Sequence, residues 1–296
     1  MMKTPLFTGC ATALITPFRD GAVDYPALDR LVEAQIAAGV NALVAVGTTG
    51  EPATMTWKEH LDVIRRVVDV AAHRVPVIAG TGSNATQEAI EAAMYAKLCG
   101  ADAQLVVTPY YNKTSQEGLI AHFNAINDAC DLPMIVYNVP GRTGINIAPA
   151  TLQQICRHPN VVAVKEANAD VGQALEKLRL CGEDAVFYSG NDDLIVPLVS
   201  MGFKGVISVL SNVCPAETAK MAACALNGQT AEAAAMQLKY LPLINALFCE
   251  TSPIPVKAAM ARLGMCAEEL RLPLIPMQPA NREKLFAIMQ ELGLTA

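Results

Sequence analysis

Eight short runs of apolar residues recur along the chain, and a segment with helical character follows each of them. The runs are rich in Val and Ile and lack strict apolar–polar alternation, which is typical of strands covered on both faces. Eight such units predict an α/β fold of the (β/α)8 barrel type, a closed parallel sheet surrounded by helices. The predicted strands are residues 9–15, 41–46, 75–80, 103–108, 133–138, 161–166, 185–190 and 205–210.

The same alternation of predicted strands and helices is also compatible with a doubly wound open sheet, which is the alternative fold. The absence of a GxGxxG motif after the first strand weakens a dinucleotide-binding version of it. From about Gly228 onward the strand pattern ends, and proline-rich breaks divide the rest into three predicted helices. We therefore expect a catalytic barrel at residues 1–228 and a C-terminal helical domain at residues 229–296.

Polar residues before two apolar stretches predict where helices begin. Thr56 with Glu59, and Thr114 with Glu117, have the spacing of a capping box. Asp192 and Asp193 stand where another helix is predicted to start, which favours an N-cap over a metal site.

Composition narrows the class of protein. Charged residues make up only 17% of the 296 residues, which indicates that part of the surface is hidden against copies of the same chain. The net charge of −6 argues against a nucleic-acid or anionic-membrane partner. The nine cysteines form no CxxC pair and the four histidines no HxxxH pair, which is typical of reduced thiols without a transition-metal site. With neither a signal peptide nor a membrane span in the sequence, we expect a cytoplasmic protein.

Lys165 is the candidate nucleophile. It ends the apolar run at residues 161–167, and burying an ammonium is costly unless the group loses its proton or has a use. A deprotonated amine forms imines with ketones and aldehydes. The alternative is a lysine at the exposed end of a strand, with its charge in water.

Polar segments follow several of the predicted strands. In a (β/α)8 barrel the chemistry gathers at the carboxyl ends of the strands, so these segments should face one mouth together with Lys165. Each segment also has a purely structural explanation. GTTGE can be a turn, the tyrosines of TPYYN can lie at an interface, Tyr137 can belong to the core, Arg142 can be solvated, and SGNDD can begin a helix. The segments are GTTGE (47–51), TPYYN (108–112), YNVPGRTG (137–144) and SGNDD (189–193).

Taken together, six segments resemble the 4-hydroxy-tetrahydrodipicolinate (dihydrodipicolinate) synthase family of pyruvate-dependent class I aldolases. N-acetylneuraminate lyase, a sibling aldolase, shares the Tyr and Lys but typically has GSTGE and lacks the arginine, so a sugar-acid aldolase is the alternative function. A barrel that only senses small acids is a third hypothesis, which the presence of both Tyr137 and Lys165 disfavours. The segments are GTTGE (47–51), TPYYNKTSQEGL (108–119), YNVPGRTG (137–144), VVAVKEA (161–167), YSGND (188–192) and SPIPVK (252–257).

The resemblance implies a role for each site residue. Lys165 forms a Schiff base with pyruvate, and Tyr137 relays protons through Thr48 and through Tyr111, which reaches in from a neighbouring subunit. The family needs no organic cofactor and no metal, and it is commonly a homotetramer built as a dimer of dimers. The residues implied to bind substrate are Thr49 for the pyruvate carboxylate, Arg142 for the carboxylate of aspartate semialdehyde, and Gly190 and Ile207 through their backbone.

The resemblance also implies a site where lysine inhibits many members. Trp57 stands where a lysine-sensitive enzyme carries His, and Pro52 replaces a common Ser, so insensitivity to lysine is the alternative. Ser252 replaces the usual Asn before PIPVK, which is expected to tune activity without abolishing it. The positions that match the lysine site are Ala53, His60, Asn84, Glu88 and Tyr110.

Overall fold

A computed structural model describes residues 3–295 and contains a closed barrel of eight parallel strands. The strands pair in the order β1-β10-β9-β8-β7-β6-β5-β4, and β4 pairs with β1, so the sheet closes on itself. The eight predicted strands are confirmed, and ring closure shows that the doubly wound alternative is wrong. The strands are β1 (Gly9–Ala13), β4 (Ala42–Ala45), β5 (Val77–Gly80), β6 (Ala103–Val107), β7 (Met134–Asn138), β8 (Val161–Glu166), β9 (Val186–Ser189) and β10 (Gly205–Ser208).

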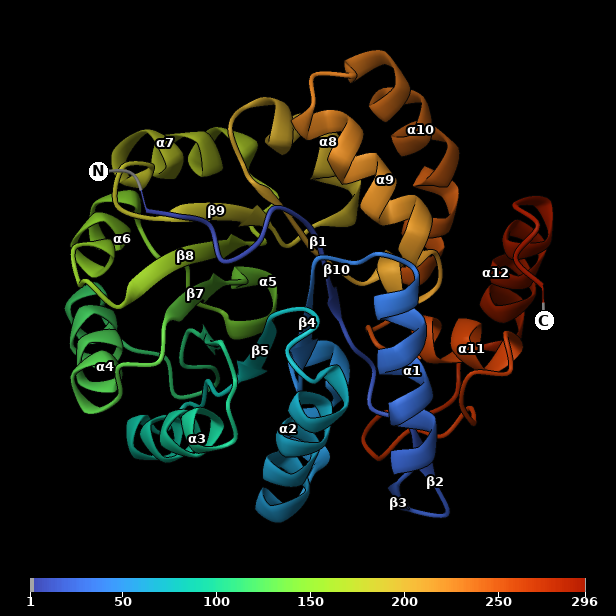
Figure 1. Ribbon diagram of the computed structural model, residues 1–296, viewed down its shortest axis with the longest axis horizontal. Coiled ribbons are helices and arrows are strands. Elements are labelled where there is room, and N and C mark those ends of the chain that lie inside the picture. The colour runs from blue at the N-terminus through green and yellow to red at the C-terminus, as the bar shows by residue number, and fades with distance from the viewer. Residues whose placement is uncertain (1–2, 296) are drawn as a thin grey trace.

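Helices surround the barrel (Figure 1). They pack on the outward side chains of the strands, while a second set of apolar side chains fills the barrel interior. The outer helices are α1 (Tyr25–Ala37), α2 (Trp57–Ala71), α3 (Thr86–Leu98), α4 (Gln116–Ala129), α6 (Pro149–Cys156), α7 (Val171–Cys181), α8 (Ile195–Ser200) and α9 (Pro215–Leu226), whereas the short α5 (Pro140–Thr143) directly follows β7 inside this ring. Short 3-10 helices follow three strands: η1 (Thr48–Gly50), η2 (Pro52–Thr54), η3 (Asp192–Leu194) and η4 (Leu210–Asn212).

One of the two predicted capping boxes is confirmed. Thr56 caps α2 and exchanges hydrogen bonds with Glu59. The prediction for Thr114 is wrong, because α4 begins one residue later, and the hydroxyl of Ser115 accepts the hydrogen bond from the amide of Gly118. An N-cap oxygen reaches the amide two or three residues ahead, so the position of the first turn selects the serine.

Asp192 has a different role from the predicted N-cap. Its carboxylate is buried and accepts hydrogen bonds from the amides of Val209 and Leu210, at 3.0 and 2.8 Å. Asp192 therefore joins the loop after β9 to the end of β10, a contact between distant segments that local spacing does not reveal.

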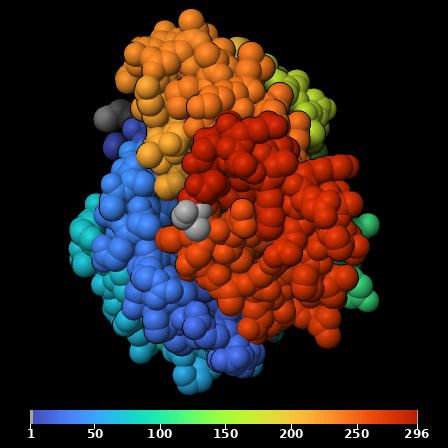
Figure 2. All heavy atoms as spheres, turned by 90° about the vertical axis from the view of Figure 1, so that its right-hand side faces the viewer, coloured from blue at the N-terminus to red at the C-terminus, as the bar shows by residue number. Residues whose placement is uncertain are grey.

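The three predicted C-terminal helices are confirmed as α10 (Thr230–Leu247), α11 (Ile254–Arg262) and α12 (Pro279–Glu291). Figure 2 shows that this segment covers one face of the molecule beside the N-terminal residues. The division into domains at residues 228 and 229 stays a prediction. Across residues 3–295, every helix is too short or too polar to cross a membrane.

A short hairpin was not predicted. β2 (Phe18–Arg19) and β3 (Ala22–Val23) pair antiparallel across Asp20 and Gly21, which have positive φ angles of 53° and 80°. An Asp-Gly pair is a strong hairpin signal, so the sequence did contain this element.

Candidate active site

Lys165 lies inside the barrel because of its place on β8. Side chains alternate between the two faces of a strand. Val164 packs in the outer core and Glu166 forms a buried ion pair with Lys177 of α7, so the intervening Lys165 faces inward beside Ala163. Only 6% of Lys165 is exposed, so the alternative of a solvated lysine at the strand's end is wrong.

Tyr137 is the immediate neighbour of Lys165. The two residues are paired in register on β7 and β8, and the Lys165 Nζ lies 4.2 Å from the centroid of the Tyr137 ring. Tyr188 occupies the same register position on β9, but its hydroxyl donates to the carbonyl of Phe7, 2.7 Å away. The Lys165 amine therefore lies against the ring of Tyr137, which lines the cavity. On its other side is Tyr188, whose hydroxyl is already hydrogen-bonded to the backbone.

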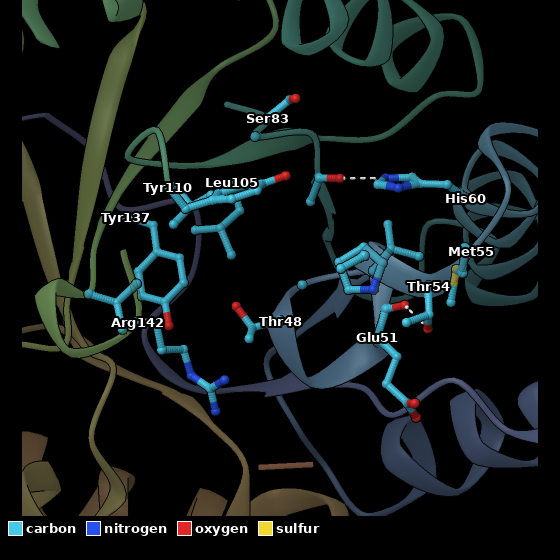
Figure 3. Close-up of a pocket in the computed structure, with 18 of the residues that line it drawn as sticks. Thr48, Glu51, Thr54, Met55, His60, Ser83, Leu105, Tyr110, Tyr137 and Arg142 are labelled. Atoms are coloured by element: carbon cyan, nitrogen blue, oxygen red, sulfur yellow. Dashed lines mark hydrogen bonds between the residues drawn. The ribbon is translucent and has the colours of Figure 1, made fainter. Parts of the chain in front are cut away.

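A cavity of about 540 Å³ opens at the carboxyl ends of the strands. Thr48, Tyr137 and Arg142 line it, and Figure 3 shows Thr48 lying between Tyr137 and Glu51, with Arg142 on the side of Tyr137. The Arg142 guanidinium donates to the carbonyl of Ser252 at 3.0 Å. A hydroxyl, a phenol and a guanidinium therefore converge on one space, as the rule for strand ends predicts.

The other predicted substrate-binding residues are Thr49, Ile207 and Gly190. Thr49 and Ile207 are buried, and Ile207 belongs to the cluster that fills the barrel interior. Gly190 leaves room for the lysine side chain, since a Cβ there would lie 2.7 Å from the Ala167 Cβ and 3.1 Å from the Lys165 Cε. A side chain at this position must displace one or the other.

We expect Gly190→Ala to slow the imine formation with a keto acid that is predicted for Lys165 by about tenfold and to lower stability by about 1–3 kcal/mol, because overpacking shifts neighbours. The measurements are the rate of adduct formation and the melting temperature. Gly172→Ala is the matched control, because it adds the same methyl group in the first turn of α7. Equal rates for the native protein and Gly190→Ala would contradict the packing argument.

Tyr111 is separated from the cavity in the single chain. It is 92% exposed and has a φ of +69°, whereas the neighbouring Tyr110 lines the cavity. The structure thus places Lys165 against Tyr137, and Tyr137 with Thr48 on one cavity, whereas Tyr111 is exposed and is not part of the cavity wall.

The sequence profile of the dihydrodipicolinate synthetase family matches residues 6–292 of the chain. The chain belongs to this family. A 4-hydroxy-tetrahydrodipicolinate synthase of Geotalea uraniireducens is 50% identical over 289 residues, which are 98% of this chain and 100% of the relative.

Two solved structures of the family are also similar. A chloride-inhibited dihydrodipicolinate synthase from Acinetobacter baumannii, in complex with pyruvate, is 42% identical, with a TM-score of 0.95 over 97% of this chain and 99% of that chain. The enzyme from Cyanidioschyzon merolae with lysine bound is 40% identical, with a TM-score of 0.95 over 98% and 100% of the two chains.

Most positions that match the family's lysine site share the cavity with the candidate catalytic residues. The His60 Nε2 lies 2.8 Å from the carbonyl oxygen of Gly80, and burial lowers the pKa of His60. The Asn84 amide donates to the carbonyl of Tyr110 at 3.2 Å. Trp57 lies next to His60, with 5.8 Å between the ring centroids. The predicted positions on the cavity wall are Ala53, His60, Glu88 and Tyr110.

Sequence reasoning missed a buried ion pair beside the cavity. The Lys257 amine of α11 donates to Glu51 at 2.6 Å, and both residues are buried. The two belong to the GTTGE and SPIPVK segments that carry the family resemblance, but they are 206 positions apart and no local pattern pairs them. Within residues 3–295, no group of three or more His, Cys, Asp or Glu side chains is placed to hold a metal ion.

Proposed function

We propose that this chain catalyses the 4-hydroxy-tetrahydrodipicolinate synthase reaction, the condensation of pyruvate with L-aspartate 4-semialdehyde in lysine and diaminopimelate biosynthesis. The observation that carries the proposal is the Lys165 amine, buried in the barrel against the ring of Tyr137. A buried amine beside a phenol has the chemistry needed to form an imine with a keto acid and to move the protons involved.

The reaction begins when the Lys165 amine adds to the C2 carbonyl of pyruvate. Loss of water from the resulting carbinolamine gives the imine, and loss of a C3 proton gives the enamine. Tyr137 supplies and accepts these protons, with Thr48 next in the relay. The enamine carbon attacks the aldehyde, and the substrate's amino group then closes the ring at C2 and releases Lys165. The covalent imine makes an organic cofactor or metal unnecessary in this scheme.

The two substrate carboxylates are bound by different residues. Thr49 holds the pyruvate carboxylate, while Gly190 and Ile207 shape the floor through their backbone. Arg142 binds the carboxylate of the semialdehyde, since a guanidinium can form two parallel hydrogen bonds to it. Arg142 also favours this reaction over sugar-acid cleavage by a sibling aldolase, whose members lack that arginine.

The proposed assembly and regulation are inferred from the relatives. The exposed Tyr111 is available to complete the proton relay of a second subunit, in a homotetramer with a cytoplasmic location. Lysine is the proposed effector, at Ala53, His60, Asn84, Glu88 and Tyr110, because a relative of 40% identity was solved with lysine bound. Pyruvate binding is likewise supported by the pyruvate complex of a relative.

The proposal is tested by incubating the protein with pyruvate and borohydride, which reduces an imine to a stable secondary amine, and weighing it. A mass increase on Lys165, together with turnover of pyruvate and aspartate semialdehyde, is the expected result. Folded protein of unchanged mass would contradict the imine, and turnover only with a sugar aldehyde would favour the sibling aldolase.

Arg142→Ala separates binding of the two substrates. We expect kcat/KM for the semialdehyde to fall about 100-fold, because hydrogen bonds to a charged group contribute roughly 1.5–3 kcal/mol. Pyruvate adduct formation should stay within about threefold of native, because that step precedes the second substrate. Arg142→Lys keeps the charge but cannot form two parallel hydrogen bonds, so its kcat/KM for the semialdehyde should lie between those of the native protein and Arg142→Ala. Equal losses in the semialdehyde and pyruvate assays would exclude the assigned role.

A further inference from the structure

Two residues of the loop that carries Thr48 and Thr49 have backbone angles that side chains rarely adopt. Val46 has a φ of +48° before the two threonines, and Glu51 has a φ of +56° after them. Such conformations are unfavourable, most of all for a β-branched residue, and they persist only where surrounding contacts hold them. The loop at residues 46–51 therefore requires external contacts to keep its shape.

Contacts hold the loop from two sides. On one side the backbone of Gly80 lies so close that a Cβ there would be 2.3 Å from the Val46 carbonyl oxygen. On the other side the Lys257 Nζ lies 2.6 Å from a carboxylate oxygen of Glu51 and 4.2 Å from the centroid of the Phe18 ring. The second contact comes from α11, in the C-terminal helical segment, and reaches the strained residue itself.

Stability alone is a poor explanation for this ion pair. Burial lowers the pKa of the Lys257 amine and raises that of the Glu51 carboxyl, so each needs the other to remain charged. The second carboxylate oxygen of Glu51 is buried without a hydrogen-bond partner in the described part of the chain. In many proteins, replacing a buried ion pair by apolar residues of similar size costs no stability or increases it. Glu51 also lines the cavity beside Thr48, which points to a role in the site (Figure 3).

We propose that Glu51 and Lys257 are positioning residues that hold the loop at residues 46–51 in the shape that presents Thr48 and Thr49 to pyruvate. The C-terminal helical segment is then part of the active site, since α11 holds a loop distant from it in the chain: Glu51 and Lys257 are 206 positions apart. This inference rests on the proposed function, because pyruvate is the ligand whose binding reports the loop.

The test compares Lys257→Met, Glu51→Met and the double variant. The measurements are the melting temperature and the rate of borohydride-trapped pyruvate adduct at increasing pyruvate concentration. Each single variant should melt lower than native, because it leaves a buried polar group unpaired. The double variant should recover most of the melting temperature but still need at least about tenfold more pyruvate for half-maximal rate, because a displaced loop binds the carboxylate poorly.

Leu152→Ala is the matched control for destabilisation alone. Leu152 is fully buried on α6 and distant in sequence from the loop and from α11. It should lower the melting temperature and leave the pyruvate requirement unchanged. Native half-saturation in the double variant, or an equal rise in Leu152→Ala, would overturn the inference. Failure of the single variants to fold leaves the double variant to decide. A native protein that forms no adduct would instead contradict the proposed function.

Discussion

Replacing Lys165 by Met should eliminate the pyruvate adduct and lower kcat by at least about 10³-fold, because the nucleophile is then absent. The fold should tolerate the change. Met is similar in length, and its apolar side chain removes the cost of placing an ammonium in a site that is only 6% exposed. We therefore expect an unchanged or raised melting temperature, so that lost activity cannot be attributed to unfolding.

Lys177→Met is the matched control for this prediction. Lys177 is also fully buried, but its amine is 2.7 Å from a carboxylate oxygen of Glu166 on the outer face of β8. Removing it leaves that buried carboxylate without a countercharge, so stability should fall by about 3–5 kcal/mol while the mass increase with pyruvate persists. An adduct that still forms in Lys165→Met would refute the assignment of the nucleophile.

The position of Lys165 shows how much of the site can be predicted from sequence. Strands buried on both faces are recognisable as continuous apolar runs, and eight of them with intervening helices specify the barrel. The barrel then fixes the mouth as the place where strand ends meet. Tyr137 and Arg142 could be assigned to that mouth because Tyr137 lies at the carboxyl end of a strand and Arg142 in the segment that follows it, and the structure places both on one cavity.

Contacts between distant segments could not be predicted in this way. The pairing of Glu51 with Lys257 and the hydrogen bonds of Asp192 to the end of β10 depend on how separate loops pack. Hydrophobic periodicity and capping rules relate residues only a few positions apart, so they do not reveal such contacts. Similarly, the choice of Ser115 over Thr114 as the cap of α4 depends on where the first turn begins, which moves by a residue with little change in the local pattern.

Tyr137→Phe should slow pyruvate adduct formation by about 10²- to 10³-fold, the usual effect of losing a general acid–base group. The variant keeps the ring whose centroid lies 4.2 Å from the Lys165 Nζ, so the amine should stay in place and the adduct should still form at long times. A time course of trapped mass, rather than an end point, is therefore the measurement that isolates the hydroxyl.

Tyr188→Phe makes the same chemical change on the other side of the lysine. Tyr188 has the same register relation to Lys165, but its hydroxyl is bound to the carbonyl of Phe7. Its loss should lower stability by about 1–3 kcal/mol, because a buried carbonyl is left unpaired, without slowing the adduct. Two phenylalanine variants that slow adduct formation equally would indicate a packing effect. If only Tyr137→Phe slows adduct formation, the ring alone is not responsible, because both variants keep it. The Tyr137 hydroxyl, which is not bound to the Phe7 carbonyl as that of Tyr188 is, is then the group that relays protons.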